Sequence, residues 1–296
     1  MTTLYTFCPQ PDPDGSCIHG AGPQLLVQAA DGGSYGTTGS GGANCLPTGC
    51  GTVFKITMAG TLTTLHSFCS QGESTGCPDG SGPNALIQAA DGHLYGTTGS
   101  GGSGTGCDGA ACGTVFKITA SGTLTTLYAF CSQGIFGDNC PDGDEPNALT
   151  QAADGNSYGI TVNGGPNIGC PRNFDGYGTV FKITPSGGLT TVYSFCAQTD
   201  PDGRCIDGSV PNGLLLATDG DLYGTTAGGG ASAFYGGYSP NEGTVSKITP
   251  AGILTTLYSL CSRGNGCADG EQPEGMLVQS REWYTPPPDA KWEQLC

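Results

Sequence analysis

One block of seven residues recurs along this chain at a nearly constant interval. GTVFKIT begins at Gly51, Gly113 and Gly178 and returns as GTVSKIT at Gly243, so that successive copies start 62, 65 and 65 residues apart. A period of this kind is typical of repeat architectures, in which one unit buries its apolar faces only against its neighbours. The repeat therefore constrains the fold more strongly than any other feature of the sequence.

Three further blocks accompany each copy. A block like PNALIQAADG starts at Pro23, Pro83, Pro146 and Pro211, with a degenerate copy at Pro273. YGTT or YGIT follows at Tyr35, Tyr95, Tyr158 and Tyr223, and a block like LTTLYSF starts at Leu62, Leu124, Leu189 and Leu254, with an extra copy, TTLYTF, at Thr2. The blocks are rich in β-branched and aromatic residues and are separated by turn dipeptides such as Asp-Gly. One unit thus predicts four short antiparallel strands.

The last block of each unit carries apolar residues on both faces of the expected strand, as Leu62 and Phe68 on one face and Leu65 on the other illustrate. A sheet that is apolar on both faces is covered on both sides, as a propeller blade is. We therefore predict an all-β, single-domain β-propeller over residues 1–296.

The number of blades depends on the two ends of the chain. Residues 262–296 form a degenerate fifth repeat, in which Trp283 and Tyr284 would begin the second strand and KWEQLC would serve as the third. TTLYTF at the N-terminus would then supply the outer strand and close a five-bladed ring without exposed edges. The alternative is an open or truncated repeat array, because PPP in this tail is a poor strand element.

Composition excludes some partners. The chain has 9 basic and 25 acidic residues, a formal charge of -16 and a pI near 4.1, which disfavours binding to nucleic acid and to anionic membranes. We expect no membrane insertion, because no apolar run is long enough to span a bilayer. No signal peptide or surface anchor is visible in this sequence.

Sixteen cysteines indicate a disulfide framework and therefore an extracellular location, secreted or at the cell surface. Most fall in close pairs within expected loops. The candidate pairs are Cys8 with Cys17, Cys45 with Cys50, Cys69 with Cys77, Cys107 with Cys112, Cys131 with Cys140, Cys196 with Cys205, and Cys261 with Cys267. Cys170 and Cys296 have no local partner and would bond to each other, bond to another molecule, or remain as thiols.

Zinc binding is the competing use of these cysteines. The pairs lack the short spacing of zinc sites, two pairs are not expected to form one four-ligand set, and the chain has only three histidines. We therefore expect no cofactor, with Ca²⁺ as the cation to consider.

A carboxylate recurs in the loops that lead from one unit to the next. Its positions are Asp79, Asp142, Asp207 and Asp269, with His19 in the first unit. These side chains would either form a rim that binds Ca²⁺ or a polyhydroxyl ligand, or cap the backbone of their own Asp-Gly turns. Repetition in every unit favours the second interpretation.

Two other groups of loop residues are weaker candidates. Asp12 with Asp14 and Asp200 with Asp202 lie in DPDG turns and would be metal ligands, although the remaining ligands of a calcium loop are missing. Aromatic residues in a long loop of the fourth unit would contact a ligand: Phe234, Tyr235 and Tyr238.

No catalytic motif stands out, because no histidine recurs at a position shared by the units and no pair of glutamates stands out. We expect a non-enzymatic extracellular module that binds a glycan, a peptide or a matrix component, or that has a structural role. One alternative is a self-associating subunit of a filament or matrix, held by strand exchange or by an intermolecular disulfide. Another is an extracellular carbohydrate-active hydrolase or lyase.

The blocks LYGTT, GTVFKIT and LTTLYSF, over residues 2 to about 280, resemble the GloVer tandem repeat of bacterial "choice-of-anchor" surface proteins. The resemblance implies a secreted protein with propeller-like repeats, and it supplies no catalytic residues. The many loop cysteines depart from that pattern, as does the absence of a recognisable anchor after Pro273.

Overall fold

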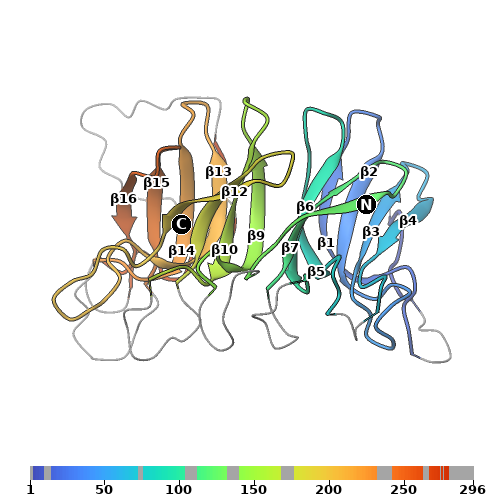
Figure 1. The fold of residues 1–296 in the computed structure, drawn as a ribbon, viewed down its shortest axis with the longest axis horizontal. Helices are drawn as coiled ribbons and strands as arrows, with labels where there is room; N and C mark the ends of the chain where they lie inside the picture. Colours follow the sequence, from blue (N-terminus) through green and yellow to red (C-terminus); the bar gives the residue numbers. More distant parts are fainter. Residues whose placement is uncertain are drawn as a thin grey trace.

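Four sheets, each of four antiparallel strands, make up the computed structural model (Figure 1). The structure describes residues 3–9, 15–72, 76–103, 112–131, 140–167, 177–231, 242–262, 267–273, 275 and 277–279. Within those ranges all regular secondary structure is β, as the sequence predicted, and no helix of the length and apolarity needed to cross a bilayer occurs there.

Each sheet is one repeat unit, and we call it a blade. Blade 1 contains β1 (Ala21–Gln28), β2 (Ser34–Ser40), β3 (Thr52–Ile56) and β4 (Leu62–Ser67), and blade 2 contains β5 (Ser81–Gln88), β6 (Leu94–Ser100), β7 (Thr114–Ile118) and β8 (Leu124–Ala129). Blade 3 contains β9 (Asp144–Gln151), β10 (Ser157–Asn163), β11 (Thr179–Ile183) and β12 (Leu189–Ser194). Blade 4 contains β13 (Ser209–Leu216), β14 (Leu222–Gly228), β15 (Thr244–Ile248) and β16 (Leu254–Ser259). The four blocks of each unit are therefore its four strands, paired in chain order.

The blades pack face to face, which explains why their strands are apolar on both sides. The first strands of successive blades contact one another, so β1, β5, β9 and β13 are the innermost strands. Aromatic rings bridge adjacent blades, with the Phe68 and Phe116 centroids 5.2 Å apart and the Phe130 and Phe181 centroids also 5.2 Å apart. All four rings are buried. These contacts run from blade 1 to blade 2 and from blade 2 to blade 3.

The two ends of the described chain occupy the places of blade strands without forming them. The Phe7 ring packs on Phe54 at 5.0 Å, as the Phe68 ring packs on Phe116 in the next blade. At the other end, Asn212 Nδ2 donates a hydrogen bond to the carbonyl oxygen of Pro273. The Thr218 amide donates to Gln279 Oε1 over 3.0 Å, as the Ala90 amide donates to Gln151 Oε1.

The prediction of five blades is wrong for the part of the chain that the structure describes, where the count is four and no ring closes. Residues 3–9, 273, 275 and 277–279 form no strand, because no described strand lies beside them to share a hydrogen-bond ladder. Trp283, Tyr284 and KWEQLC, which were expected to supply those partners, lie outside the described residues. Figure 1 places blades 1 and 4 at opposite sides of the molecule.

Candidate functional site

The connections between strands gather at two ends of the blades. Antiparallel strands alternate in direction, so the second-to-third connections and the blade-to-blade connections lie at one end, and the short turns lie at the other. The first end carries every disulfide of the described residues, and we call it the stapled rim. We call the opposite end the turn rim.

Six disulfides have both cysteines among the described residues, and each joins two cysteines that sequence spacing had paired. They are Cys8–Cys17, Cys45–Cys50, Cys69–Cys77, Cys131–Cys140, Cys196–Cys205 and Cys261–Cys267. Cys112 is also disulfide-bonded. Cys107, Cys170 and Cys296 lie outside the described residues.

The first cysteine after each outer strand has a left-handed backbone. Cys69, Cys131, Cys196 and Cys261 have φ between 56° and 60°, a region that costs an L-residue about 1 to 2 kcal/mol. Each of these cysteines is bridged to a second cysteine further along the same loop.

Two of the bridges lie against each other, which corrects one expectation from the sequence. The Sγ atoms of Cys45, Cys50, Cys69 and Cys77 are all within 4.8 Å of one another, although two pairs were not expected to form one set. The sequence could not show this, because one pair lies within blade 1 and the other lies between blades 1 and 2.

The recurring carboxylate of the blade-to-blade loops is hydrogen-bonded to its own loop. Asp79 Oδ2 accepts from the Ser70 amide over 3.1 Å and from Ser70 Oγ over 2.8 Å, and it lies 2.9 Å from His66 Nε2. Burial by itself would raise the pKa of Asp79, but the hydrogen bonds from His66 and Ser70 outweigh burial and leave that pKa below its ordinary value.

His66 lies in the outer strand of blade 1, and a tyrosine takes its place in the outer strands of the other three blades. The hydroxyls of Tyr128, Tyr193 and Tyr258 donate to Asp142 Oδ2, Asp207 Oδ2 and Asp269 Oδ2 over 2.8, 2.5 and 2.6 Å. These hydrogen bonds link each outer strand to the loop that follows it. One oxygen of every recurring carboxylate, Oδ2, therefore has a structural role.

The environments of these carboxylates nevertheless differ. Burial raises the pKa of Asp207, although the hydrogen bond from Tyr193 opposes that effect. The hydrogen bond from Tyr258 is the main cause that lowers the pKa of Asp269 to about 2. The second oxygen, Oδ1, is buried without a hydrogen-bond partner in all four residues. A role of the four in binding Ca²⁺ or another ligand stays a prediction.

The DPDG turns give a similar picture where they are described. Asp200 Oδ1 accepts from the amides of Asp202 and Arg204, both over 2.9 Å, so this side chain caps its own turn. A metal role of Asp200 and Asp202 stays a prediction. Asp12, Asp14, Phe234, Tyr235 and Tyr238 lie outside the described residues.

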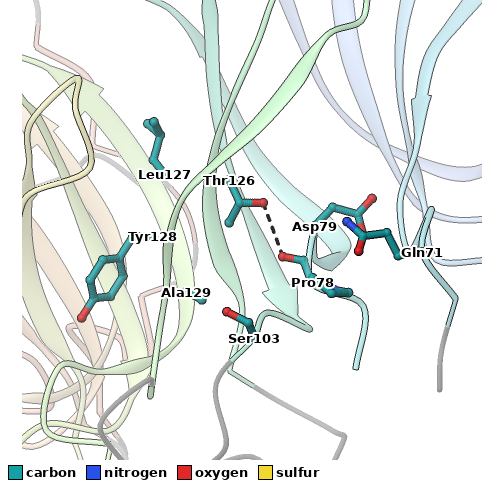
Figure 2. Close-up of a pocket in the computed structure, with 8 residues that line it drawn as sticks. All are labelled: Gln71, Pro78, Asp79, Ser103, Thr126, Leu127, Tyr128 and Ala129. Atoms are coloured by element: carbon teal, nitrogen blue, oxygen red, sulfur yellow. Dashed lines mark hydrogen bonds between the residues drawn. The ribbon is translucent and has the colours of Figure 1, made fainter. Parts of the chain in front are cut away.

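A pocket of about 360 Å³ opens on the stapled rim between the loop that follows blade 1 and the outer strand of blade 2. Its lining residues are Gln71, Pro78, Asp79, Ser103, Thr126, Leu127, Tyr128 and Ala129. Figure 2 shows Thr126 directed towards Pro78, whose carbonyl oxygen accepts from Thr126 Oγ1 over 3.4 Å, with Asp79 and Gln71 beyond it. The pocket therefore presents an amide and hydroxyl groups to a ligand.

The turn rim carries a second repeated polar cluster, which the sequence analysis missed. Asp31 Oδ2 accepts from Tyr35 OH and from Lys55 Nζ, both over 2.7 Å, and the Lys55 ammonium lies 4.9 Å from the Tyr35 ring centroid. Blade 2 repeats the arrangement with Asp91, Tyr95 and Lys117. The signal was the Lys present in every copy of GTVFKIT or GTVSKIT, together with the Asp of each first turn, but the two residues lie more than 20 positions apart in the sequence.

Together, the sheets and the stapled loops define a repeat protein of blade-like sheets. The model of the Gloeobacter/Verrucomicrobia repeat matches residues 1–236, and the chain belongs to this family. This match confirms the resemblance to the GloVer repeat. No curated protein matches the chain.

Several solved structures resemble this chain at low sequence identity. The GH93 α-L-arabinofuranosidase of Fusarium graminearum, solved with arabinobiose, is 12% identical with a TM-score of 0.52, over 90% of this chain and 71% of that chain. A protein of unknown function from Dyadobacter fermentans is 12% identical with a TM-score of 0.47, over 83% and 69% of the two chains. A luciferin-regenerating enzyme is 12% identical with a TM-score of 0.44 over 80% of this chain, which spans 62% of that enzyme. These likenesses concern the fold alone.

Proposed function

We propose that this protein is an extracellular, non-enzymatic binding module, and that the ligand is a glycan held on the stapled rim. The pocket beside β8 carries this proposal, because it combines groups from two rim loops and one strand. Gln71, Ser103 and Thr126 line this pocket with hydrogen-bond donors and acceptors, which suits a polyhydroxyl ligand.

Disulfides support the extracellular part of the proposal. Bridges of this number persist in oxidising compartments and are rare where thiols are kept reduced. Because they close the loops of a single rim, they hold those loops in place before a ligand arrives, and preorganisation of this kind lowers the entropic cost of binding.

Binding should be tested with the oxidised full chain on a printed panel of bacterial and plant cell-wall polysaccharides. Titration calorimetry would follow with an oligosaccharide of any polysaccharide that is retained. We expect Thr126→Val and Gln71→Ala to weaken binding about tenfold or more, equivalent to about 1.4 kcal/mol. Thr256→Val, at the matching position of β16, is the control and should leave binding unchanged.

Three outcomes count against the proposal. Retention of no polysaccharide would contradict the ligand class, and equal losses in Thr126→Val and Thr256→Val would contradict the location. Recovery of cleaved oligosaccharide after incubation would favour the hydrolase or lyase alternative instead.

A further inference from the structure

The paired bridges of blade 1 bring four sulfur atoms into one buried cluster. Cys45 and Cys50 come from the loop between β2 and β3, and Cys69 and Cys77 come from the loop between β4 and β5. All four Sγ atoms lie within 4.8 Å of one another. Cys50 and Cys69 are buried, whereas Cys45 is only half-buried and gives access from the rim.

We propose that, when both bridges are reduced, these four thiolates bind one Zn²⁺ ion. A tetrahedral Zn²⁺ with ligands at about 2.3 Å places its sulfur atoms about 3.8 Å apart. Reduction frees the two sulfur atoms of each bridge to move apart towards that spacing, and no two of the four lie more than 4.8 Å apart at the start. Thiolates favour Zn²⁺ over Ca²⁺ or Mg²⁺ because they are soft ligands.

Reduction of the two bridges requires an external reductant. Two equivalents of an external phosphine and two of water convert the two S–S bonds into four thiols: each phosphine gives two electrons and takes the oxygen of one water to become phosphine oxide, and the protons of the two waters go to the four sulfur atoms. Zn²⁺ binding then displaces those protons. Closure of the bridges by an oxidant would release the ion.

Backbone hydrogen bonds hold the two loops together independently of the sulfur atoms. The Gly82 amide donates to the carbonyl oxygen of Cys50 over 2.8 Å, which links the first loop to the start of blade 2. The Cys69 amide donates to the carbonyl oxygen of Gly80 over 3.2 Å, and this bond closes the second loop. The four cysteines therefore stay close together after reduction, and a zinc ion would pin both loops in a chain that has not yet been oxidised.

A second cluster of the same kind lies one blade further on. The Sγ atoms of Cys112, Cys131 and Cys140 are within 4.8 Å of one another. By contrast, Cys261 and Cys267 belong to no such cluster among the described residues. They provide a matched control bridge.

The test is metal titration of the full chain after anaerobic reduction with a phosphine. Co²⁺ is added first, because a tetrahedral thiolate site gives intense visible d–d bands, and Zn²⁺ should then displace it. We expect the double variant Cys45→Ser/Cys50→Ser to bind one equivalent fewer than the unmodified chain. The control Cys261→Ser/Cys267→Ser should keep the unmodified stoichiometry, and the oxidised protein should give no such bands.

Equal stoichiometry in the unmodified chain and in Cys45→Ser/Cys50→Ser would overturn the proposal, as would the absence of tetrahedral bands. Circular dichroism separates a folded site from uptake by an unfolded chain. If the reduced protein loses its β signal, Zn²⁺ must restore it, and metal uptake without that recovery also overturns the proposal.

Discussion

The Phe116 ring lies over Gly96, its cross-strand partner in blade 2. A Cβ atom on Gly96 would overlap the tip of that ring and would lie 2.5 Å from the carbonyl oxygen of Ala85. The same pairing joins Gly36 to Phe54 and Gly159 to Phe181. The Gly of YGTT and the Phe of GTVFKIT are thus two halves of one contact, in which the ring fills the space that the glycine leaves.

Gly96→Ala should therefore destabilise the protein by about 1 to 3 kcal/mol or more, the usual cost of overpacking a filled core. Urea denaturation would measure the loss. Gly224→Ala is the matched control, because Ser246 stands opposite Gly224 in place of the phenylalanine. A cost for Gly224→Ala as large as that for Gly96→Ala would show that the ring is not responsible.

The link between Asp79 and His66 gives a second prediction. Asp79→Ala removes the acceptor of the Ser70 amide and the partner of His66 Nε2 in a buried loop, so we expect a loss of about 1 to 3 kcal/mol in the free energy of unfolding. Asp202→Ala, in an exposed turn, should cost much less. His66→Tyr should be tolerated, since a tyrosine makes this bond in the other blades, and strong destabilisation by that change would contradict the equivalence.

Acid should weaken the fold through the turn rim. The hydrogen bond from Lys55 is the main cause that lowers the pKa of Asp31 to about 2. For Asp91, burial opposes the shift, but the hydrogen bond from Lys117 helps to bring the pKa to about 2. A carboxyl whose folded pKa lies below its unfolded pKa stabilises the fold above the unfolded value, and that contribution is lost as pH falls through the folded value.

We therefore expect stability to fall as the pH is lowered from about 4 to about 2. Thermal unfolding across this range would measure it, and Asp31→Asn/Asp91→Asn should flatten the slope. Asp207 affects the pH dependence of stability in the opposite direction, because its raised pKa makes ionisation unfavourable in the folded protein. Its contribution therefore weakens as pH rises above the ordinary value. An unchanged slope in the double variant would refute the assignment to the turn rim.

A buried hydroxyl pair joins the second and third strands of every blade. In blade 2, Thr98 Oγ1 lies 2.9 Å from Thr114 Oγ1 and accepts from the Thr114 amide over 3.0 Å. Thr98→Val leaves two buried polar groups of Thr114 without a partner, at an expected cost of about 1 to 3 kcal/mol. Thr125→Val, on an exposed position of β8, is the control. Chemical denaturation of both variants tests the difference, and equal stability of the two would contradict the role of the pair.

Much of the fold could be predicted because its information is local. Each blade has its four strands at the positions of the four blocks, and β3, β7 and β11 all have the sequence TVFKI from the GTVFKIT block. The short bridges were predictable for the same reason, since two cysteines that close one small loop are neighbours along the chain. The recurring aspartate was expected to cap its own Asp-Gly turn, whereas Asp79 accepts from the Ser70 amide at the other end of the loop.

Contacts between separate loops, strands and units could not be predicted from the sequence. The packing of the Cys45–Cys50 bridge on the Cys69–Cys77 bridge, the pocket beside β8 and the ion pair of Asp31 with Lys55 all join residues from separate loops or strands. The count of four described blades also depends on whether the terminal segments find strands to pair with. The sequence by itself determined the repeat, its strands and its local bridges, because each depends on residues close together in the chain. Only the tertiary structure decided what meets across blades, because spacing within a unit does not record how units pack.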